Sequence, residues 1–97
     1  MRIKAKRKKG ITVVKFMAKH IMLSLAEAKK RGKVGNYITY IVATNNEEIV
    51  FEVNTSQSLS KDPYLMFKYR GGNKGDKLKI VWKDLLGNEK IGEVKLK

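Results

Sequence analysis

The sequence lacks cysteine, and it has a single histidine, His20, and a single proline, Pro63. Without cysteine the chain has no disulfide, no thiol nucleophile and no thiolate ligand for a metal. A zinc site built from imidazoles needs more than the one histidine present. The sequence therefore predicts no metal-binding or cofactor-binding residues, and cysteine usage says nothing about the redox compartment.

Long apolar runs are also missing. Residues 1–9 are basic and the run ITVVKFMA follows them, but Lys15, Lys19 and His20 interrupt it. A cleavable signal needs an apolar core of about seven or more residues, and a membrane-spanning helix needs about 20. We therefore expect a soluble chain with no signal peptide of its own and no membrane span.

Acidic residues are scarce and unevenly placed. The chain has 22 Lys and Arg against 9 Asp and Glu, a formal charge of +13. Residues 1–40 carry 12 bases and one acid, Glu27, whereas residues 41–60 carry three acids and no base. This asymmetry predicts a basic face opposite a neutral or acidic one. Such a face attracts nucleic acid, an anionic membrane or an acidic protein, and composition leaves all three open.

Apolar residues recur mostly at every second position, which is typical of strands rather than helices. Clusters of glycine or asparagine stand where most of the alternating runs stop. The run 37–44 is apolar on both faces, as in a central strand between packed layers. The expected strands cover residues 2–6, 11–18, 37–44, 49–53, 64–69, 77–83 and 89–96.

Seven short strands in 97 residues predict an all-β protein, an immunoglobulin-like β-sandwich of antiparallel strands. A small barrel is the structural alternative. We expect one domain, residues 1–97. The exception to the strand pattern is SLAEAKKRG, in which Ser24 and Glu27 match a capping box and Gly32 could end a helix. Because the segment is short, we interpret it as a loop with helical tendency.

The segment GGNKGDK invites comparison with a phosphate-binding loop. That motif needs G-x-x-x-x-G-K-[ST] between a strand and a helix. Here Asp76 stands five residues after Gly71, no Ser or Thr follows Lys77, and the next segment alternates like a strand. The glycines instead permit the positive backbone angles of a tight reversal, which predicts a hairpin connection.

Side chains that could perform chemistry are few. Asp62, Asp76 and Asp84 lie near turns, where aspartates usually bond to their own backbone. His20 stands among apolar neighbours, which favours packing over general-base catalysis. We therefore predict no catalytic residues. Four aromatic residues could stack on nucleic-acid bases, but most share a face with aliphatic residues and should point inward. They are Tyr64, Phe67, Tyr69 and Trp82.

The stretch SKDPYLMFKYRGGNKGDKLKIVWKDLLG resembles the C-terminal signature of the SoxZ family, and MRIKAKRKKGITVVK resembles its opening. Between them, residues 25–60 match only in length and strand order. His20-Ile21-Met22 resembles the family's His-Pro-Met step with isoleucine in place of proline, which removes the constraint that a proline places on the backbone of the residue before it. The signature residues are Lys61, Pro63, Tyr64, Phe67, Gly75, Asp76 and Trp82.

The resemblance implies an immunoglobulin-like subunit that forms a heterodimer with SoxY, whose C-terminal cysteine carries the sulfur substrate. By this resemblance the chain is no enzyme and needs no cofactor. It stabilises and presents the cysteine-bearing partner during thiosulfate oxidation and helps sulfur-oxidising enzymes to dock transiently. The resemblance also implies a periplasmic location, reached by co-export with a partner that bears the signal. A basic nucleic-acid-binding β-domain is the alternative function.

A partner surface should hold apolar and aromatic side chains and few charges. The long segment without a base is residues 41–60. We therefore hypothesise that part of residues 37–56, including Tyr37, Tyr40 and Phe51, lies at or beside the partner surface. A strand buried on both faces explains the same apolar run.

Overall fold

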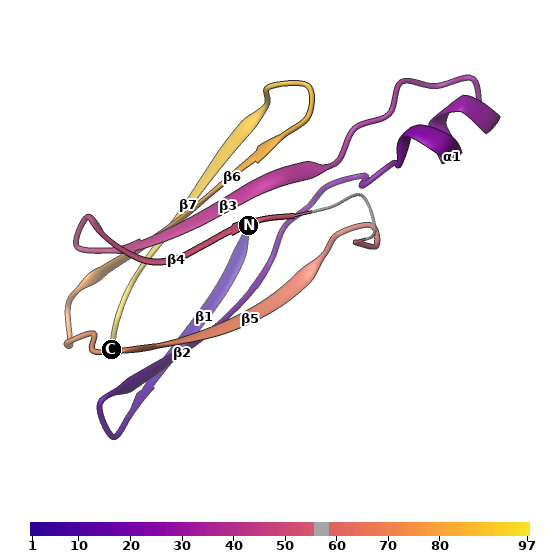
Figure 1. Ribbon diagram of the computed structural model, residues 1–97. Helices are drawn as coiled ribbons and strands as arrows, with labels where there is room; N and C mark the ends of the chain where they lie inside the picture. The colour runs from indigo at the N-terminus through magenta and orange to yellow at the C-terminus, as the bar shows by residue number, and fades with distance from the viewer. Residues whose placement is uncertain (56–58) are drawn as a thin grey trace.

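The computed structural model describes residues 1–55 and 59–97, which form seven strands and one short helix (Figure 1). Each strand end lies within two residues of the position that the alternating pattern predicts. The elements are β1 (Arg2–Lys8), β2 (Ile11–Met17), α1 (Leu25–Lys30), β3 (Ile38–Asn45), β4 (Glu48–Asn54), β5 (Tyr64–Arg70), β6 (Lys77–Asp84) and β7 (Glu89–Lys95).

The strands form two antiparallel sheets that lie face to face (Figure 1). One sheet has the order β1-β2-β5, and the other has the order β4-β3-β6-β7. This arrangement confirms the predicted sandwich and excludes the barrel. In a constant-type immunoglobulin domain the fourth strand belongs to the sheet of the first two strands. Here β4 pairs with β3 instead, so the second sheet has four strands.

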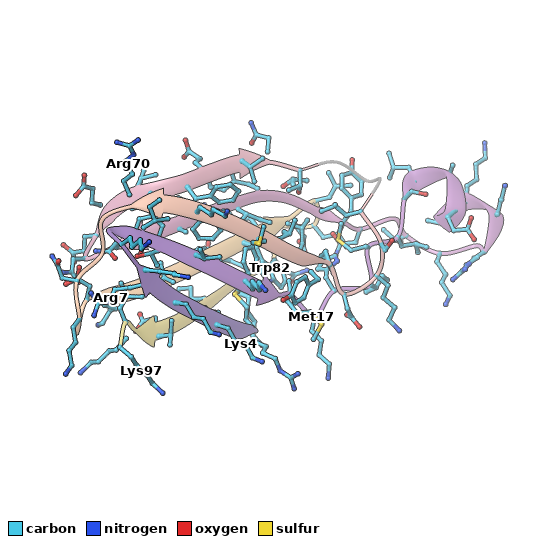
Figure 2. The ribbon with its side chains drawn as sticks, turned by 90° about the horizontal axis from the view of Figure 1, so that it is seen from below. Lys4, Arg7, Met17, Arg70, Trp82 and Lys97 are labelled. Carbon is cyan, nitrogen blue, oxygen red and sulfur yellow. The ribbon has the colours of Figure 1, made fainter. Side chains whose placement is uncertain are left out.

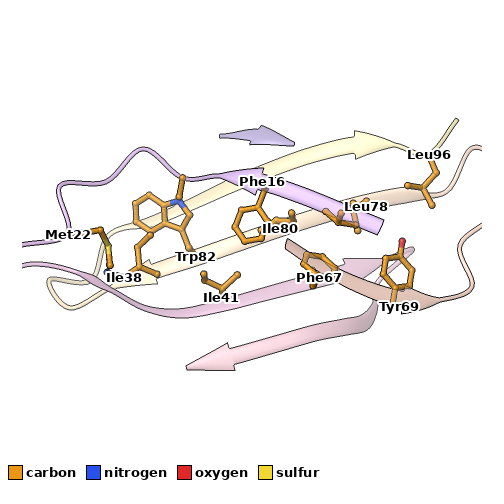
Figure 3. Close-up of a cluster of buried hydrophobic side chains, with 13 residues drawn as sticks. Phe16, Met22, Ile38, Ile41, Phe67, Tyr69, Leu78, Ile80, Trp82 and Leu96 are labelled. Atoms are coloured by element: carbon orange, nitrogen blue, oxygen red, sulfur yellow. The ribbon is translucent and has the colours of Figure 1, made fainter. Parts of the chain in front are cut away.

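The core lies between the sheets and is filled by alternate residues of the strands (Figure 3). On β6, Leu78 and Ile80 are fully buried and Trp82 is 7% exposed, while Lys79 and Val81 between them point outward. Phe16 of β2 and Ile41 of β3 meet them from the two sheets. Burial of such side chains contributes roughly 1.5–3 kcal/mol each. The face of each sheet that holds these alternate apolar residues is therefore the face that packs into the core.

Four aromatic rings connect the two sheets. Phe67 of β5 stacks on Phe51 of β4, with ring centroids 4.4 Å apart and an interplanar angle of 8°. The edge of Phe16 meets Phe67 at 6.1 Å, and Tyr69 lies 6.2 Å from Phe67 on its other side. Phe67 and Tyr69 are 6% and 9% exposed, which confirms that these two candidate stacking residues point inward.

The segment expected to be a loop contains a six-residue helix, α1. The Ser24 hydroxyl accepts a hydrogen bond from the Glu27 backbone N–H at 3.2 Å. At the other end Gly32 has φ +63°, and Lys33 N–H donates to the Ala28 carbonyl at 2.8 Å. Caps at both ends therefore stabilise the helix despite its short length. In the described part of the chain no helix has the length and apolarity that a membrane crossing requires.

The glycine-rich loop between β5 and β6 is not a hairpin, because these two strands belong to different sheets. Gly71, Gly72 and Gly75 have φ of 101°, 87° and 90°, so the glycines serve a crossing from one sheet to the other. The Asp76 carboxylate accepts a hydrogen bond from Asn73 N–H, 2.9 Å away, within the loop. The same carboxylate accepts from the side-chain amides of Asn45 and Asn46. These bonds tie the loop to the β3–β4 turn.

Candidate partner interface

An apolar row crosses the outer face of the four-stranded sheet, the face that points away from the core. Val42 of β3 lies opposite Val81 of β6, which lies opposite Ile91 of β7. We call these three residues the apolar row. Ile91 is 51% exposed. Ile49 of β4 is 58% exposed and lies opposite Thr44, which is two residues after Val42 on β3. Neither the helix nor another described strand covers this row (Figure 1).

Most charges beside the apolar row are paired. Lys77 Nζ lies 3.8 Å from Glu93 Oε2, and Lys83 Nζ lies 3.9 Å from Glu89 Oε2. Exposed pairs of this kind add little stability, but they leave the face close to neutral. An apolar centre inside a polar rim of low net charge is the usual anatomy of a protein interface.

The three residues predicted for the partner surface do not lie on one face. Tyr40 points outward beside the apolar row, and its hydroxyl donates to the Glu52 carboxylate, which raises the pKa of Tyr40. Phe51 faces inward and stacks on Phe67, while Tyr37 packs beside the core. Contact with a partner stays a prediction for all three, and residue 56 of the proposed range lies outside the described residues.

A buried polar cluster lies at the end of the sandwich where β6 leaves the sheet. The Asp84 carboxylate accepts from His20 Nε2 at 3.0 Å and from the side-chain amides of Asn36 and Asn88 at 2.9 and 3.0 Å. It also accepts from the Asn88 backbone N–H at 2.8 Å. Three segments that are distant in sequence therefore meet on one carboxylate.

Both nitrogens of the His20 ring are engaged. Nδ1 accepts from the Met22 backbone N–H at 3.0 Å, so Nε2 carries the proton and donates to Asp84. The His20 and Asp84 side chains are 5% and 2% exposed, and the Trp82 ring packs against the imidazole edge-on at 5.1 Å. Because both side chains are enclosed, the pair holds the surrounding loops in place, which agrees with the packing role predicted for His20. The described residues hold no group of three His, Asp or Glu that could bind a metal.

The cluster makes stability depend on pH in acid. Burial opposes ionisation of Asp84, but the bonds from His20, Asn36 and Asn88 outweigh it and lower its pKa from 3.8 to about 2. Because the folded pKa is the lower one, the stabilisation is complete above about pH 4 and is lost as pH falls toward 2. We expect a loss of roughly 2 kcal/mol of unfolding free energy over that interval. Denaturant titrations at several pH values measure it, and D84N should lack this component.

The signature residues of the resemblance divide into buried and exposed groups. Phe67 and Trp82 belong to the core, and Pro63 is buried with its carbonyl accepting from Ala18 N–H at 3.0 Å. Lys61 is exposed, and Tyr64 is 64% exposed on the outer face of the three-stranded sheet. Gly75 and Asp76 shape the crossing loop. Most of the signature residues thus stabilise the fold. The other two, Lys61 and Tyr64, are exposed and accessible to a partner.

Sequence reasoning missed two features of these surfaces. The apolar row was not predicted, because its residues come from three strands and only the register between them makes a row. The pairing of His20 with Asp84 joins residues 64 positions apart. The one sequence signal for it was that both residues fall within segments that resemble the same family.

Two comparisons with known proteins bear on the chain. A comparison with curated proteins gives no match. The family model described as "Sulphur oxidation protein SoxZ" matches residues 1–95 of the 97-residue chain. The match covers every strand of the sandwich, the crossing loop and the His20–Asp84 cluster. The chain therefore belongs to the SoxZ family, and its role lies in sulfur oxidation.

Proposed function

We propose that this chain is the non-catalytic subunit of a SoxYZ-type sulfur-carrier heterodimer. It stabilises and presents a SoxY-like partner whose C-terminal cysteine carries the sulfur intermediates of thiosulfate oxidation. The chain has no cysteine, which is consistent with the reactive sulfur lying on the other subunit. Membership of the SoxZ family supports the same division of labour.

The observation that carries this proposal is the apolar row on the outer face of the four-stranded sheet. Val81 is its centre, lying opposite Val42 on one side and Ile91 on the other. In water this row exposes apolar area that an association would bury, at roughly 25 cal/mol per Å². The lysines and glutamates beside the row are already paired with each other, so they require no charged group from a partner. An apolar centre with paired charges around it fits a second polypeptide rather than a small substrate.

A charge placed in the apolar row should abolish the heterodimer. V81E would bury an unpaired carboxylate against the partner, at a cost of several kcal/mol, so we expect more than a hundredfold weaker association. The measurement is co-expression with a SoxY-like chain followed by size exclusion at moderate salt.

V13E is the matched control, because Val13 occupies the corresponding outward position on β2, the middle strand of the other sheet. Its co-elution with the partner should be unchanged. If V81E is folded and still co-elutes while V13E does not, the partner binds the other sheet and the proposed interface is wrong.

We also propose that the chain reaches the periplasm by co-export with its signal-bearing partner. Membership of the SoxZ family supports this proposal, because the resemblance to that family implies export together with a signal-bearing partner. Deleting that partner's signal should leave both chains in the cytoplasmic fraction. Periplasmic recovery of this chain after the deletion would contradict co-export.

A further inference from the structure

The outer face of the three-stranded sheet carries positive charge and no negative charge. Alternate residues of β1, β2 and β5 point away from the core, and none of them is Asp or Glu. Five of these positions are apolar or aromatic. The others, which we call the basic face, are Arg2, Lys4, Lys6, Lys8, Lys15, Lys68 and Arg70. Figure 2 views the molecule from this side, with Lys4 and Met17 on neighbouring strands.

Nothing within the described chain neutralises the basic face. The ion pairs between acids and Lys or Arg lie on α1 and on the four-stranded sheet. Lys4 stands directly opposite Lys15, and like charges in that position destabilise a sheet. The fold therefore maintains a repulsion on this face that an anionic partner would relieve.

The basic face also contains places for apolar contacts. Tyr64 and Met66 of β5 are 64% and 55% exposed. At one end of the face, Arg2, Lys4, Lys15, Met17 and Tyr64 line a shallow hollow of about 140 Å³. A hollow with three cations, a thioether and a phenol suits an acidic side chain that has an apolar neighbour. Met and Tyr are also enriched at the centres of protein interfaces.

We propose that the basic face docks an acidic polypeptide segment with interspersed apolar side chains. Single-stranded nucleic acid binds by stacking its bases on several aromatic rings, and Tyr64 is the one ring on this face. The apolar residues between the lysines, such as Val13 and Met66, would have no counterpart on a phosphate backbone. The face is remote from the apolar row, since it belongs to the other sheet.

The test compares probes of different chemistry. A peptide of four Glu-Glu-Leu-Gly repeats is titrated into the chain by calorimetry at about 150 mM salt, where charges are screened beyond about 8 Å. A peptide with serine in place of leucine, oligo-dT of similar charge and phosphatidylglycerol vesicles are titrated in parallel. We expect the leucine peptide to bind at least about tenfold more tightly than each of the others. Equal or tighter binding of any other probe would overturn the proposal.

The variant K4E/K15E/K68E reverses three charges of the basic face. The control K19E/K33E/K90E makes the same change in net charge at exposed lysines elsewhere. The first variant should weaken peptide binding at least about tenfold and the control less than about threefold, because the interaction depends on position and not only on total charge. Circular dichroism would check that both variants remain folded. Equal losses in the two variants would show that the face has no special role.

Discussion

Replacing Phe67 by alanine is expected to lower the free energy of unfolding by about 3–5 kcal/mol. The ring is 6% exposed and lies between the sheets, against Phe16 on its own sheet and Phe51 on the other. Truncation would remove buried area and both ring contacts, and would leave a cavity between two sheets held apart by their other side chains. For a chain of this length each kcal/mol corresponds to roughly 4–8 °C, so the melting temperature should fall by more than about 12 °C.

M66A is the matched control for this substitution. Met66 is the neighbour of Phe67 on β5, but it points outward and is 55% exposed. Its truncation should change the unfolding free energy by less than about 0.5 kcal/mol. Denaturant unfolding followed by tryptophan fluorescence measures both, since Trp82 is in the core. A loss below about 1 kcal/mol in F67A would show that the sheets close around the gap and that the aromatic contact is not what holds them together.

The contrast between Phe67 and Met66 also shows what a sequence can predict here. Side chains on a strand alternate between faces, so once a segment is identified as a strand its inward residues follow without knowledge of the partner. The buried set on β6, Leu78, Ile80 and Trp82, is the one that alternation predicts. The basic outer residues of β1 follow from the same rule, whereas the contrast between a basic and a neutral or acidic face was predicted from the uneven charge along the chain.

The assignment of strands to sheets did not follow from local pattern. Glycines at positions 71, 72 and 75 permit positive φ, and both a hairpin and a crossing between sheets use such residues. What decides between them is the pairing of β6 with β3 and β7, which leaves no edge of β6 for β5. The Asp76 carboxylate then bonds to Asn45 and Asn46, about 30 residues earlier. The inward position of Phe51 was left open for a related reason. Ile49, Val50 and Phe51 are consecutive apolar residues, so alternation did not distinguish a core ring from a surface ring.

Replacing Asp84 by alanine should destabilise the fold by about 3–5 kcal/mol, because several buried donors would lose their acceptor. The carboxylate accepts bonds from His20, Asn36 and Asn88. In D84A these donors stay at the buried end of the sandwich without an acceptor, and each unmet donor costs about 1–3 kcal/mol. D76A removes a carboxylate that also accepts from asparagines, but near solvent, so its effect should be clearly smaller.

A double-mutant cycle separates the His20–Asp84 contact from the rest of the cluster. If the imidazole mainly serves Asp84, then H20A and D84A together should cost about 1–3 kcal/mol less than the sum of the two single changes. Purely additive losses would mean that His20 stabilises the loops through its bond from Met22 N–H and its contact with Trp82 alone. A coupling in this range would instead make the buried pair one unit, binding the segment before α1 to the end of β6.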